Sequence, residues 1–382
     1  MVTYPEDWTP MQLKDLGYIQ MCRRIFQSQT KAYGAIPFYK ISTFGGKADA
    51  YISQELYEQY KALYPYPEKG DVLISAAGTV GKTVIFDGRD SYFQDSNIVW
   101  LKVDKNAIDR KFLWWFYRSY PWEALEGTTI QRLYNSIILK TEIHLPDKPE
   151  QEEIARTLSQ FDTYIDDLAE LIEKKCGIRD GTINDLLSAT TRLAGFDKSW
   201  KETTLGKEYT VIMGQSPNSA SYNASGIGVP LVQGNADIEN RVTAPKRYTS
   251  MPTKICENGD TILAVRAPVG TASRANQRVC LGRGVCAISG MHKDFIYYLM
   301  RYYESAWEAI EQGSTFTAVS GKEVRNFEIK IPEEGEEQDA ISQILIAMDE
   351  EIEALEIERD KMIQIREGAM DDLLTGRVRL SV

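Results

Sequence analysis

Apolar residues recur at alternating steps of four and three in the stretch that follows Pro149. They are Ile154, Leu158, Phe161, Ile165, Leu168 and Ile172. This spacing places them on one face of a helix at the coiled-coil period. The same steps return 187 residues later, at Ile341, Leu345, Met348, Ile352 and Leu355. We therefore predict two long helices that lie antiparallel and pack along this seam as an intramolecular coiled coil.

Acidic residues precede both seams, where carboxylates stabilise the start of a helix. We expect the helices to begin after Pro149 and near Gly335, and to end near Gly195 and Gly376. About forty residues at about 1.5 Å each give a rod of roughly 60 Å. Glycines interrupt the first seam and arginines occupy seam positions of the second, at Gly177, Gly181, Arg359 and Arg366.

The segments outside these helices also form a repeat. Trp8 returns as Trp200, Gly70-Asp71 as Gly259-Asp260, Val80-Gly81 as Val269-Gly270, and Gly127-Thr128-Thr129 as Gly313-Ser314-Thr315. Such a repeat indicates two copies of one architectural unit. We predict two globular blocks, each followed by one long helix, with boundaries at residues 1–148, 149–195, 196–332 and 333–382.

Within each block, short apolar runs bounded by Gly, Pro and Asp predict strands. The runs are Val72–Ser75, Val84–Phe86, Asn97–Val103, Thr261–Val265 and Val285–Ser289. Helices with an aromatic face are expected at Lys111–Glu126 and Lys293–Gln312. The predicted fold class is α+β, with two similar blocks separated by the two long helices in a pseudo-twofold repeat. Two similar surfaces would then be held at a fixed separation.

The aromatic faces admit two interpretations. They are base-stacking platforms, or they belong to the core of each block. Phe112 is matched by Phe295 and Trp115 by Tyr298 in the two copies. A shared face favours the shared core.

The net charge of −11 is distributed unevenly. Residues 1–145 carry 17 Lys and Arg against 16 Asp and Glu, and residues 200–331 carry 15 against 12. The helical stretches hold the acid, with 7 against 12 in residues 146–199 and 5 against 15 in residues 332–382. The weakly basic blocks therefore permit DNA contact, which the charge of the whole chain does not indicate.

Catalytic and metal motifs are weak. Ala76 to Thr83 fits a relaxed phosphate-loop pattern, but a strand-like run follows it where a helix is required. With only His144 and His292 available, no catalytic triad can be nominated. The five cysteines show no CxxC spacing, so neither a zinc site nor a disulfide framework is expected. We expect no catalytic residues and no bound metal, although acidic residues are numerous enough to leave a nuclease cluster open.

Polar loops that differ between the copies are the candidate recognition sites. Amides and hydroxyls read base edges, and basic side chains hold phosphates. In the first block the candidates for DNA contact are Arg23, Arg24 and Lys40. In the second block they are Gln215, Ser216, Asn218, Asn223, Gln233 and Asn235. An ordinary solvated loop is the alternative for each single residue.

Together these features resemble the specificity subunit of type I restriction-modification systems. The resemblance is carried by Trp200 to Leu205, Met213-Gly214-Gln215-Ser216-Pro217, Gly259-Asp260 with Val269-Gly270, Gly313-Ser314-Thr315, and Pro332, Gln338, Ile341, Leu345 and Asp349. It covers almost the whole chain. The first half shows the same frame through Trp8, Gly70-Asp71, Gly127-Thr128-Thr129, Pro146, Gln151, Ile154, Leu158 and Asp162, and lacks the Gly-Gln-Ser-Pro run.

The resemblance implies that each block is a target recognition domain that reads one half of a bipartite sequence in double-stranded DNA. The helices would space the two domains and dock two modification (methyltransferase) subunits. It also implies partner restriction subunits, and S-adenosylmethionine, ATP and Mg²⁺ used by the partners, with no cofactor in this chain. The first twenty residues contain no signal-peptide core or membrane span, so the cytoplasm is the expected location.

Other functions remain possible on the sequence alone. One is a coiled-coil adaptor that holds two proteins without binding DNA. Another is a nucleotide-binding enzyme that uses Gly78 to Thr83. A third is the specificity subunit of a related system that cuts on both sides of its site, which would differ in its partner chain.

Overall fold

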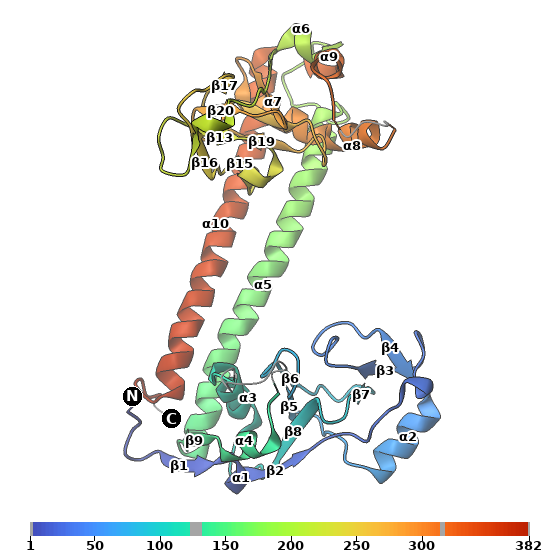
Figure 1. Ribbon diagram of the computed structural model, residues 1–382, viewed down its shortest axis with the longest axis vertical. Helices are drawn as coiled ribbons and strands as arrows, with labels where there is room; N and C mark the ends of the chain where they lie inside the picture. The colour runs from blue at the N-terminus through green and yellow to red at the C-terminus, as the bar shows by residue number, and fades with distance from the viewer. Residues whose placement is uncertain (1–2, 123–131, 314–317, 381–382) are drawn as a thin grey trace. The chain divides into compact units, whose positions relative to one another are not determined.

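The computed structural model describes residues 3–122, 132–313 and 318–380. The chain divides into two compact units, residues 1–169 with 358–382, and residues 170–357. The long helices α5 (Lys148–Leu187) and α10 (Gly335–Leu374) each contribute a section to both units (Figure 1). The repeated motifs Gly127-Thr128-Thr129 and Ser314-Thr315 lie outside the described residues.

Both long helices are 40 residues in length. Helix α10 ends two residues before Gly376, whose φ of 71° suits the left-handed position that follows a helix. Helix α5 ends at Leu187, which is earlier than the end expected near Gly195. The reason is that Ala189 takes up the left-handed conformation, with φ of 59°, and its amide donates to the carbonyl of Leu186.

The seam residues are distributed between two environments. The first members of each seam lie in the core of a block: Ile154 and Leu158 share a cluster with Leu373 and Leu374, and Ile341 and Leu345 share one with Leu186 and Leu187. Further along, Ile165, Leu168, Ile172 and Ile352 are at most 9% exposed, and Phe161, Met348 and Leu355 are partly buried.

Polar contacts join the two helices within each unit. In the first unit Arg366 Nη1 donates to Asp162 Oδ1 at 2.7 Å. In the second, Lys175 Nζ lies 2.6 Å from Glu351 Oε1. Arg366, an arginine on the predicted seam, thus extends across to the opposite helix. The helices pair antiparallel, because contacts earlier in α5 meet residues later in α10.

The first block has a four-stranded sheet in the order β2-β8-β5-β6, a three-stranded sheet β4-β3-β7 and the pair β1-β9. Its strands are β1 Thr9–Gln12, β2 Gly17–Gln20, β3 Ile36–Tyr39, β4 Ala50–Ile52, β5 Val72–Ser75, β6 Thr83–Ile85, β7 Tyr92–Phe93, β8 Ile98–Val103 and β9 Glu142–Leu145. Its helices are α1 Leu13–Leu16, α2 Gln54–Leu63, α3 Arg110–Ser119 and α4 Asn135–Lys140, with a 3₁₀ turn η1 at Gln27–Gln29.

The second block has sheets in the orders β11-β21-β18-β19-β15-β14 and β12-β16-β13-β20-β17, with the pair β10-β22. Its strands are β10 Trp200–Thr204, β11 Thr210–Met213, β12 Tyr222–Asn223, β13 Val229–Val232, β14 Ile238–Glu239, β15 Val242–Thr243, β16 Arg247–Thr249, β17 Ile255–Cys256, β18 Thr261–Ala264, β19 Ala272–Arg274, β20 Val279–Leu281, β21 Val285–Ser289 and β22 Glu328–Pro332. Its helices are α6 Leu205–Glu208, α7 Lys293–Tyr302, α8 Glu304–Gly313 and α9 Gly321–Asn326, with 3₁₀ turns η2 at Ser219–Ser221 and η3 at Asn235–Asp237.

The two blocks share a topology. The order β2-β8-β5-β6 corresponds to β11-β21-β18-β19, β4-β3-β7 to β16-β13-β20, and β1-β9 to β10-β22. In both, a parallel pair forms between strands distant in sequence, β3 with β7 and β13 with β20. This repeat confirms the predicted α+β class with two similar blocks and two long helices.

The aromatic helices differ in length from the prediction. Helix α3 ends at Ser119, because Pro121 disfavours helical backbone at the residue before it. The last part of the predicted helix, from residue 123 to Glu126, lies outside the described residues. The stretch from Lys293 to Gln312 forms two helices, α7 and α8, interrupted at Tyr303. The assignment of the aromatic faces to the core is confirmed, since Phe112, Trp115, Phe295 and Tyr298 are at most 1% exposed.

Candidate nucleic-acid interface

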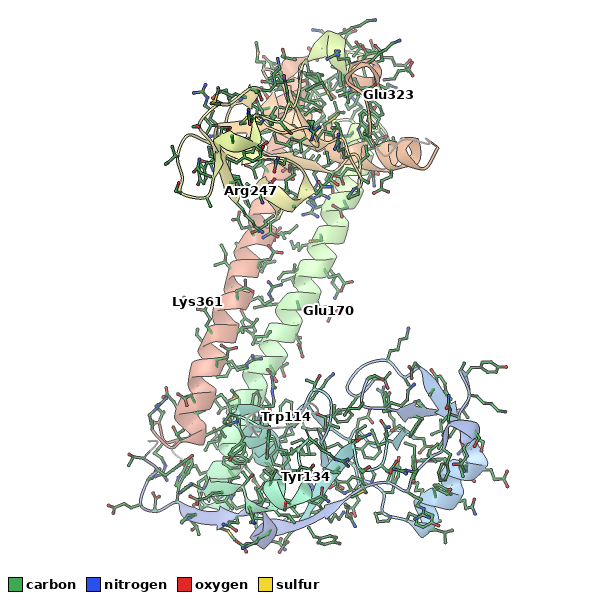
Figure 2. The ribbon with its side chains drawn as sticks, viewed as in Figure 1. Trp114, Tyr134, Glu170, Arg247, Glu323 and Lys361 are labelled. Atoms are coloured by element: carbon green, nitrogen blue, oxygen red, sulfur yellow. The ribbon has the colours of Figure 1, made fainter. Side chains whose placement is uncertain are left out.

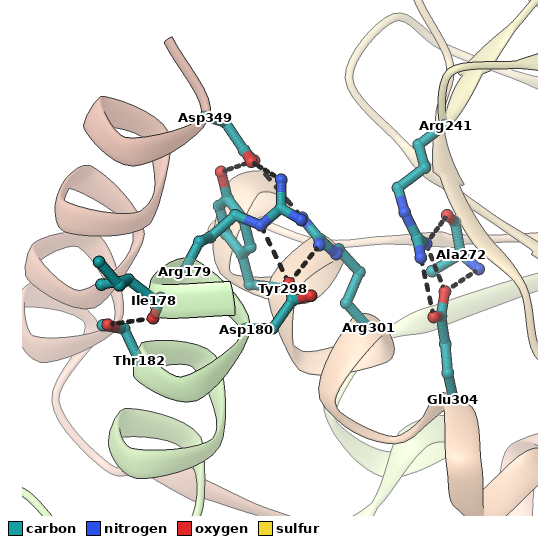
Figure 3. Close-up of polar contacts among 10 residues, drawn as sticks. All are labelled: Ile178, Arg179, Asp180, Thr182, Arg241, Ala272, Tyr298, Arg301, Glu304 and Asp349. Atoms are coloured by element: carbon teal, nitrogen blue, oxygen red, sulfur yellow. Dashed lines mark hydrogen bonds and ion pairs between the residues drawn. The ribbon is translucent and has the colours of Figure 1, made fainter. Parts of the chain in front are cut away.

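An aspartate between two arginines fixes the second block to the helix pair (Figure 3). Asp349 of α10 accepts hydrogen bonds from Arg179 Nη1 at 3.0 Å and from the hydroxyl of Tyr298 on α7 at 2.7 Å. Arg301 Nη1, also from α7, lies 3.5 Å from Asp349 and is almost fully buried. Its Nη2 donates to Asp180 at 3.2 Å. The block is therefore held to both helices by charged hydrogen bonds.

The first block repeats this arrangement. Asp162 of α5 lies 2.6 Å from Arg118 of α3 and 2.7 Å from Arg366 of α10. The guanidinium of Arg118 stacks 4.6 Å from the ring centres of Trp114 and Trp115. The two blocks are thus attached to their helices by matching contacts, and differences between them lie elsewhere.

Four loops of the second block converge at one end of its sheets. The amides of Gly214 and Gln215 donate to Val285 and Leu281 carbonyls at 3.1 and 2.9 Å. The amides of Gly282 and Gly284 donate to the carbonyls of Val232 and Gln233 at 2.7 and 3.1 Å. Asn235 Nδ2 donates to the carbonyl of Pro268 at 3.0 Å. These bonds bring together loops that are up to about 70 residues apart in sequence.

The six residues of the second block that were predicted to contact DNA fall into two groups, according to the hydrogen bonds of their side chains. Asn218 caps a 3₁₀ turn through Ala220, and Asn223 accepts from the amide and donates to the carbonyl of Ile227. Both amides close local turns. The Ser216 hydroxyl accepts from the amide of Arg283 at 3.2 Å.

The side chains of the remaining predicted residues keep hydrogen-bonding groups that have a distant partner or none among the described residues. Gln233 Nε2 makes one long hydrogen bond, 3.4 Å, to the hydroxyl of Tyr222. Asn235 Oδ1 is buried and has no hydrogen-bond partner among the described residues. Gln215 is exposed, and its bonds run through its backbone, the carbonyl accepting from the hydroxyl of Thr253. Gln215, Gln233 and Asn235 lie on the converging loops.

The three predicted residues of the first block are exposed or partly exposed and already have partners. Arg24 Nε lies 2.9 Å from Asp95 Oδ2, and Lys40 Nζ lies 2.8 Å from Asp49 Oδ1. The guanidinium of Arg23 lies 5.1 Å from the ring centre of Tyr64. A cavity of about 590 Å³ is lined on one side by Lys40 and contains neither arginine in its lining.

The nucleotide-site pattern Ala76 to Thr83 forms a loop between β5 and β6. Strand β6 begins at Thr83, so the loop amides do not open a helix as a phosphate loop requires. The prediction of a turn is confirmed by Gly81, with φ of 84°. Within residues 3–122, 132–313 and 318–380, no group of three or more His, Cys, Asp or Glu side chains is arranged to hold a metal ion. All five cysteines are free thiols, and burial raises the pKa of Cys22, Cys256 and Cys286 to about 12.

Comparison with known proteins adds to this geometry. A family model described as the type I restriction modification DNA specificity domain matches the chain twice, at residues 5–175 and 197–363. The chain belongs to this family. Each match of the specificity-domain model includes one block and most of the long helix that follows it.

Curated relatives agree with this assignment, and a solved structure shares the fold. The putative type I restriction enzyme MjaX specificity subunit of Methanocaldococcus jannaschii is 30% identical, with 98% of this chain and 95% of that protein aligned. A putative specificity subunit of Haemophilus influenzae is 52% identical over 160 residues, 42% of each chain. The crystal structure of a type I restriction-modification S subunit from M. genitalium matches 98% of this chain and 97% of its own, with a TM-score of 0.63 and 18% identity. That likeness concerns the fold.

Within this specificity-domain frame, several cations near the converging loops were not among the candidates from the sequence. Arg283 and Lys254 lie beside the loop of Gln215, and Arg266 lies on the loop after β18. Arg247 lies on β16 and is labelled in Figure 2. In the first block Lys31 lines the same cavity as Lys40. The sequence Gly282-Arg283-Gly284 is a signal that could have identified one of them, since glycines on both sides of a cation mark a tight, close-packed turn.

Among the described parts of the chain, no helix is long and apolar enough to cross a membrane.

Proposed function

We propose that this chain supplies the DNA sequence specificity of a type I restriction-modification complex, with each block reading one half of a bipartite target. The proposal rests on one contrast. The two blocks are attached to the long helices by matching contacts, but the tips of their equivalent loops carry different residues. Asp162 and Asp349 hold their blocks to the helices in the same way. The equivalent loops present Arg24 paired with Asp95 in one block, and Ser216 beside Arg283 in the other.

The helices would set the unread gap between the half-sites and dock two methyltransferase subunits. Support comes from Leu171 and Ile178, which are exposed on the part of α5 in the second unit and lie seven residues apart. Apolar residues at this spacing share one helix face, the form of surface on which a partner helix packs. The block and its long helix occur twice in the chain, which is why we propose two such subunits.

Catalysis would reside in the partner subunits and not in this chain. Methyl transfer from S-adenosylmethionine would belong to the methyltransferases, and the use of ATP and Mg²⁺ to the restriction subunits. The loops of this chain would contribute amide, hydroxyl and basic groups that bind bases and phosphates. A protein that acts on the chromosome in this way would work in the cytoplasm.

The proposal is tested by co-expressing the chain with a type I methyltransferase subunit from the same organism, in a host without DNA methylases, and sequencing the methylome. We expect a bipartite motif with methylated adenine that is absent when this chain is omitted. Replacing residues 1–195 by the same region of a relative should change one half of the motif and leave the other half.

A stable complex of the two proteins that methylates no new motif would contradict the proposal. That outcome would favour an adaptor that joins two proteins without reading DNA. DNA binding by the complex that does not depend on sequence would lead to the same conclusion.

A further inference from the structure

The loops of the second block are packed backbone against backbone. A β-carbon on Gly214 would collide with the carbonyl of Gly282, and one on Gly284 would collide with the carbonyl of Gln233. The Gly284 carbonyl also accepts from the amide of Val265 at 2.9 Å. Each loop therefore limits the movement of the next, and side chains at their tips start from well-defined positions.

Arg283 lies at the centre of this packing, between the two glycines. Its backbone amide donates a hydrogen bond to the hydroxyl of Ser216, and its side chain is exposed. Its guanidinium has no ion-pair partner in the described part of the chain. By contrast, Arg241 pairs with Glu304, and Arg278 with Glu257 at 3.4 Å.

The equivalent loop of the first block carries an acidic residue instead of an arginine that is unpaired among the described residues. Matching bonds, Ala76 amide to Asn97 carbonyl at 2.7 Å and Val265 amide to Gly284 carbonyl, align the loop Gln94–Asn97 with Gly282–Gly284. There Asp95 pairs with Arg24, which corresponds to Ser216. The scaffold therefore does not need an arginine at this loop, and Arg283 is specific to the second block.

We propose that Arg283 reads a guanine in the major groove, in the half-site bound by the second block. This inference rests on the proposed function. A guanidinium presents two parallel N–H donors that match the O6 and N7 acceptors of guanine. The neighbouring side chains on the converging loops, Gln215 and Gln233, carry amides, the groups that read base edges. Lys254 lies nearby, because its carbonyl accepts from the amide of Leu281 at 2.7 Å. Its ammonium group is a compact charge that suits a phosphate.

The test compares the co-expressed complexes of wild type, Arg283→Ala, Arg283→Lys and the control Arg278→Ala. Arg278 is exposed in the same block and already has an acidic partner. We expect Arg283→Ala to lower methylation of the wild-type site by roughly tenfold or more and to relax one guanine of the second half-site. The first half-site and the gap should be unchanged. Arg283→Lys should retain binding but discriminate less well, because lysine lacks the planar fork, and Arg278→Ala should behave as wild type.

Two results would overturn the inference while leaving the proposed function intact. One is an unchanged motif with weaker binding to all sequences and a shallower salt dependence, which is the behaviour of a phosphate contact. The other is no change at all. If the wild-type complex itself yields no motif, the proposed function fails and this inference fails with it. Thermal unfolding of Arg283→Ala at the wild-type temperature would show that the variant is folded.

Discussion

Arg192 pairs with Glu337, a carboxylate that is only 1% exposed. Its Nε lies 2.8 Å from Glu337 Oε1, and its Nη2 donates to the other oxygen at 3.0 Å. Glu337 lies in the first turn of α10, and Arg192 follows the end of α5. The same offset of 187 residues relates this pair to Glu150 and Arg379, which lie 2.6 Å apart in the first unit. Each unit is thus closed by a bidentate pair between one helix start and the segment after the other helix.

Arg192→Met should therefore destabilise the second unit by about 3 kcal/mol, because it leaves a buried carboxylate without its counter-charge. Methionine keeps an apolar side chain at the site, so lost packing contributes little. Urea unfolding monitored by tryptophan fluorescence measures the change. The control is Arg156→Met, which removes an exposed pair with Glu153 and should leave the free energy of unfolding nearly unchanged. Equal effects of the two variants would show that the buried pair contributes no more to the free energy of unfolding than an exposed pair.

Glycines at two kinds of position should respond in opposite directions to alanine. Gly177 lies within α5 with open space around its missing β-carbon, so Gly177→Ala should stabilise the chain by about 1 kcal/mol. Gly270 has φ of 90° and lies against the side chain of Trp307, so Gly270→Ala should cost about 2 kcal/mol or more. Differential scanning calorimetry distinguishes the two. A loss of stability in Gly177→Ala would indicate that the helix is bent or packed at that point.

Acid should weaken one surface network of the first block. Hydrogen bonds from Lys102 and Lys105 lower the pKa of Glu68 from 4.5 to about 2. A carboxyl whose folded pKa is depressed contributes stability above its unfolded pKa and loses it as pH falls through the folded value. The difference in unfolding free energy between wild type and Glu68→Gln should therefore shrink between about pH 5 and pH 2. It should be about 0.5 kcal/mol at most, because the side chain is more than half exposed.

The measurement is urea unfolding of wild type and Glu68→Gln at pH 5 and at pH 3. Glu202→Gln is the control, since Glu202 is exposed and no described residue forms an ion pair with it. A difference for Glu68→Gln that stays constant with pH would contradict the assignment.

Asp95 should restrain DNA binding by the first block. It neutralises Arg24, whose side chain is 61% exposed. Asp95→Asn removes a negative charge and releases the arginine, so the complex should bind DNA about threefold more tightly at low salt, with a steeper salt dependence. Fluorescence anisotropy across a salt series measures both. Asp87→Asn, at an exposed aspartate paired with Arg89, is the matched control. Unchanged affinity in Asp95→Asn would place Arg24 away from the DNA.

The sequence by itself determined the repeat, the two long helices and the fold class. These depend on local periodicity and on self-similarity, which a linear pattern records in full. Strands such as Val72–Ser75 and Val285–Ser289 were predictable for the same reason. The ends of α3 and α5 were less so, because a single proline or one residue in the left-handed conformation ends a helix that periodicity would extend.

Only the tertiary structure decided which polar side chains remain free. Asn218 and Asn223 looked like candidates for DNA contact because they are amides in a loop, and the fold uses both to close turns. Arg283 was not among the sequence candidates, because its setting is created by strands and loops from four separate stretches of the chain, joined by bonds that no local pattern encodes. Local composition shows which groups are present, but hydrogen bonding between distant segments determines which of them stay available to a ligand.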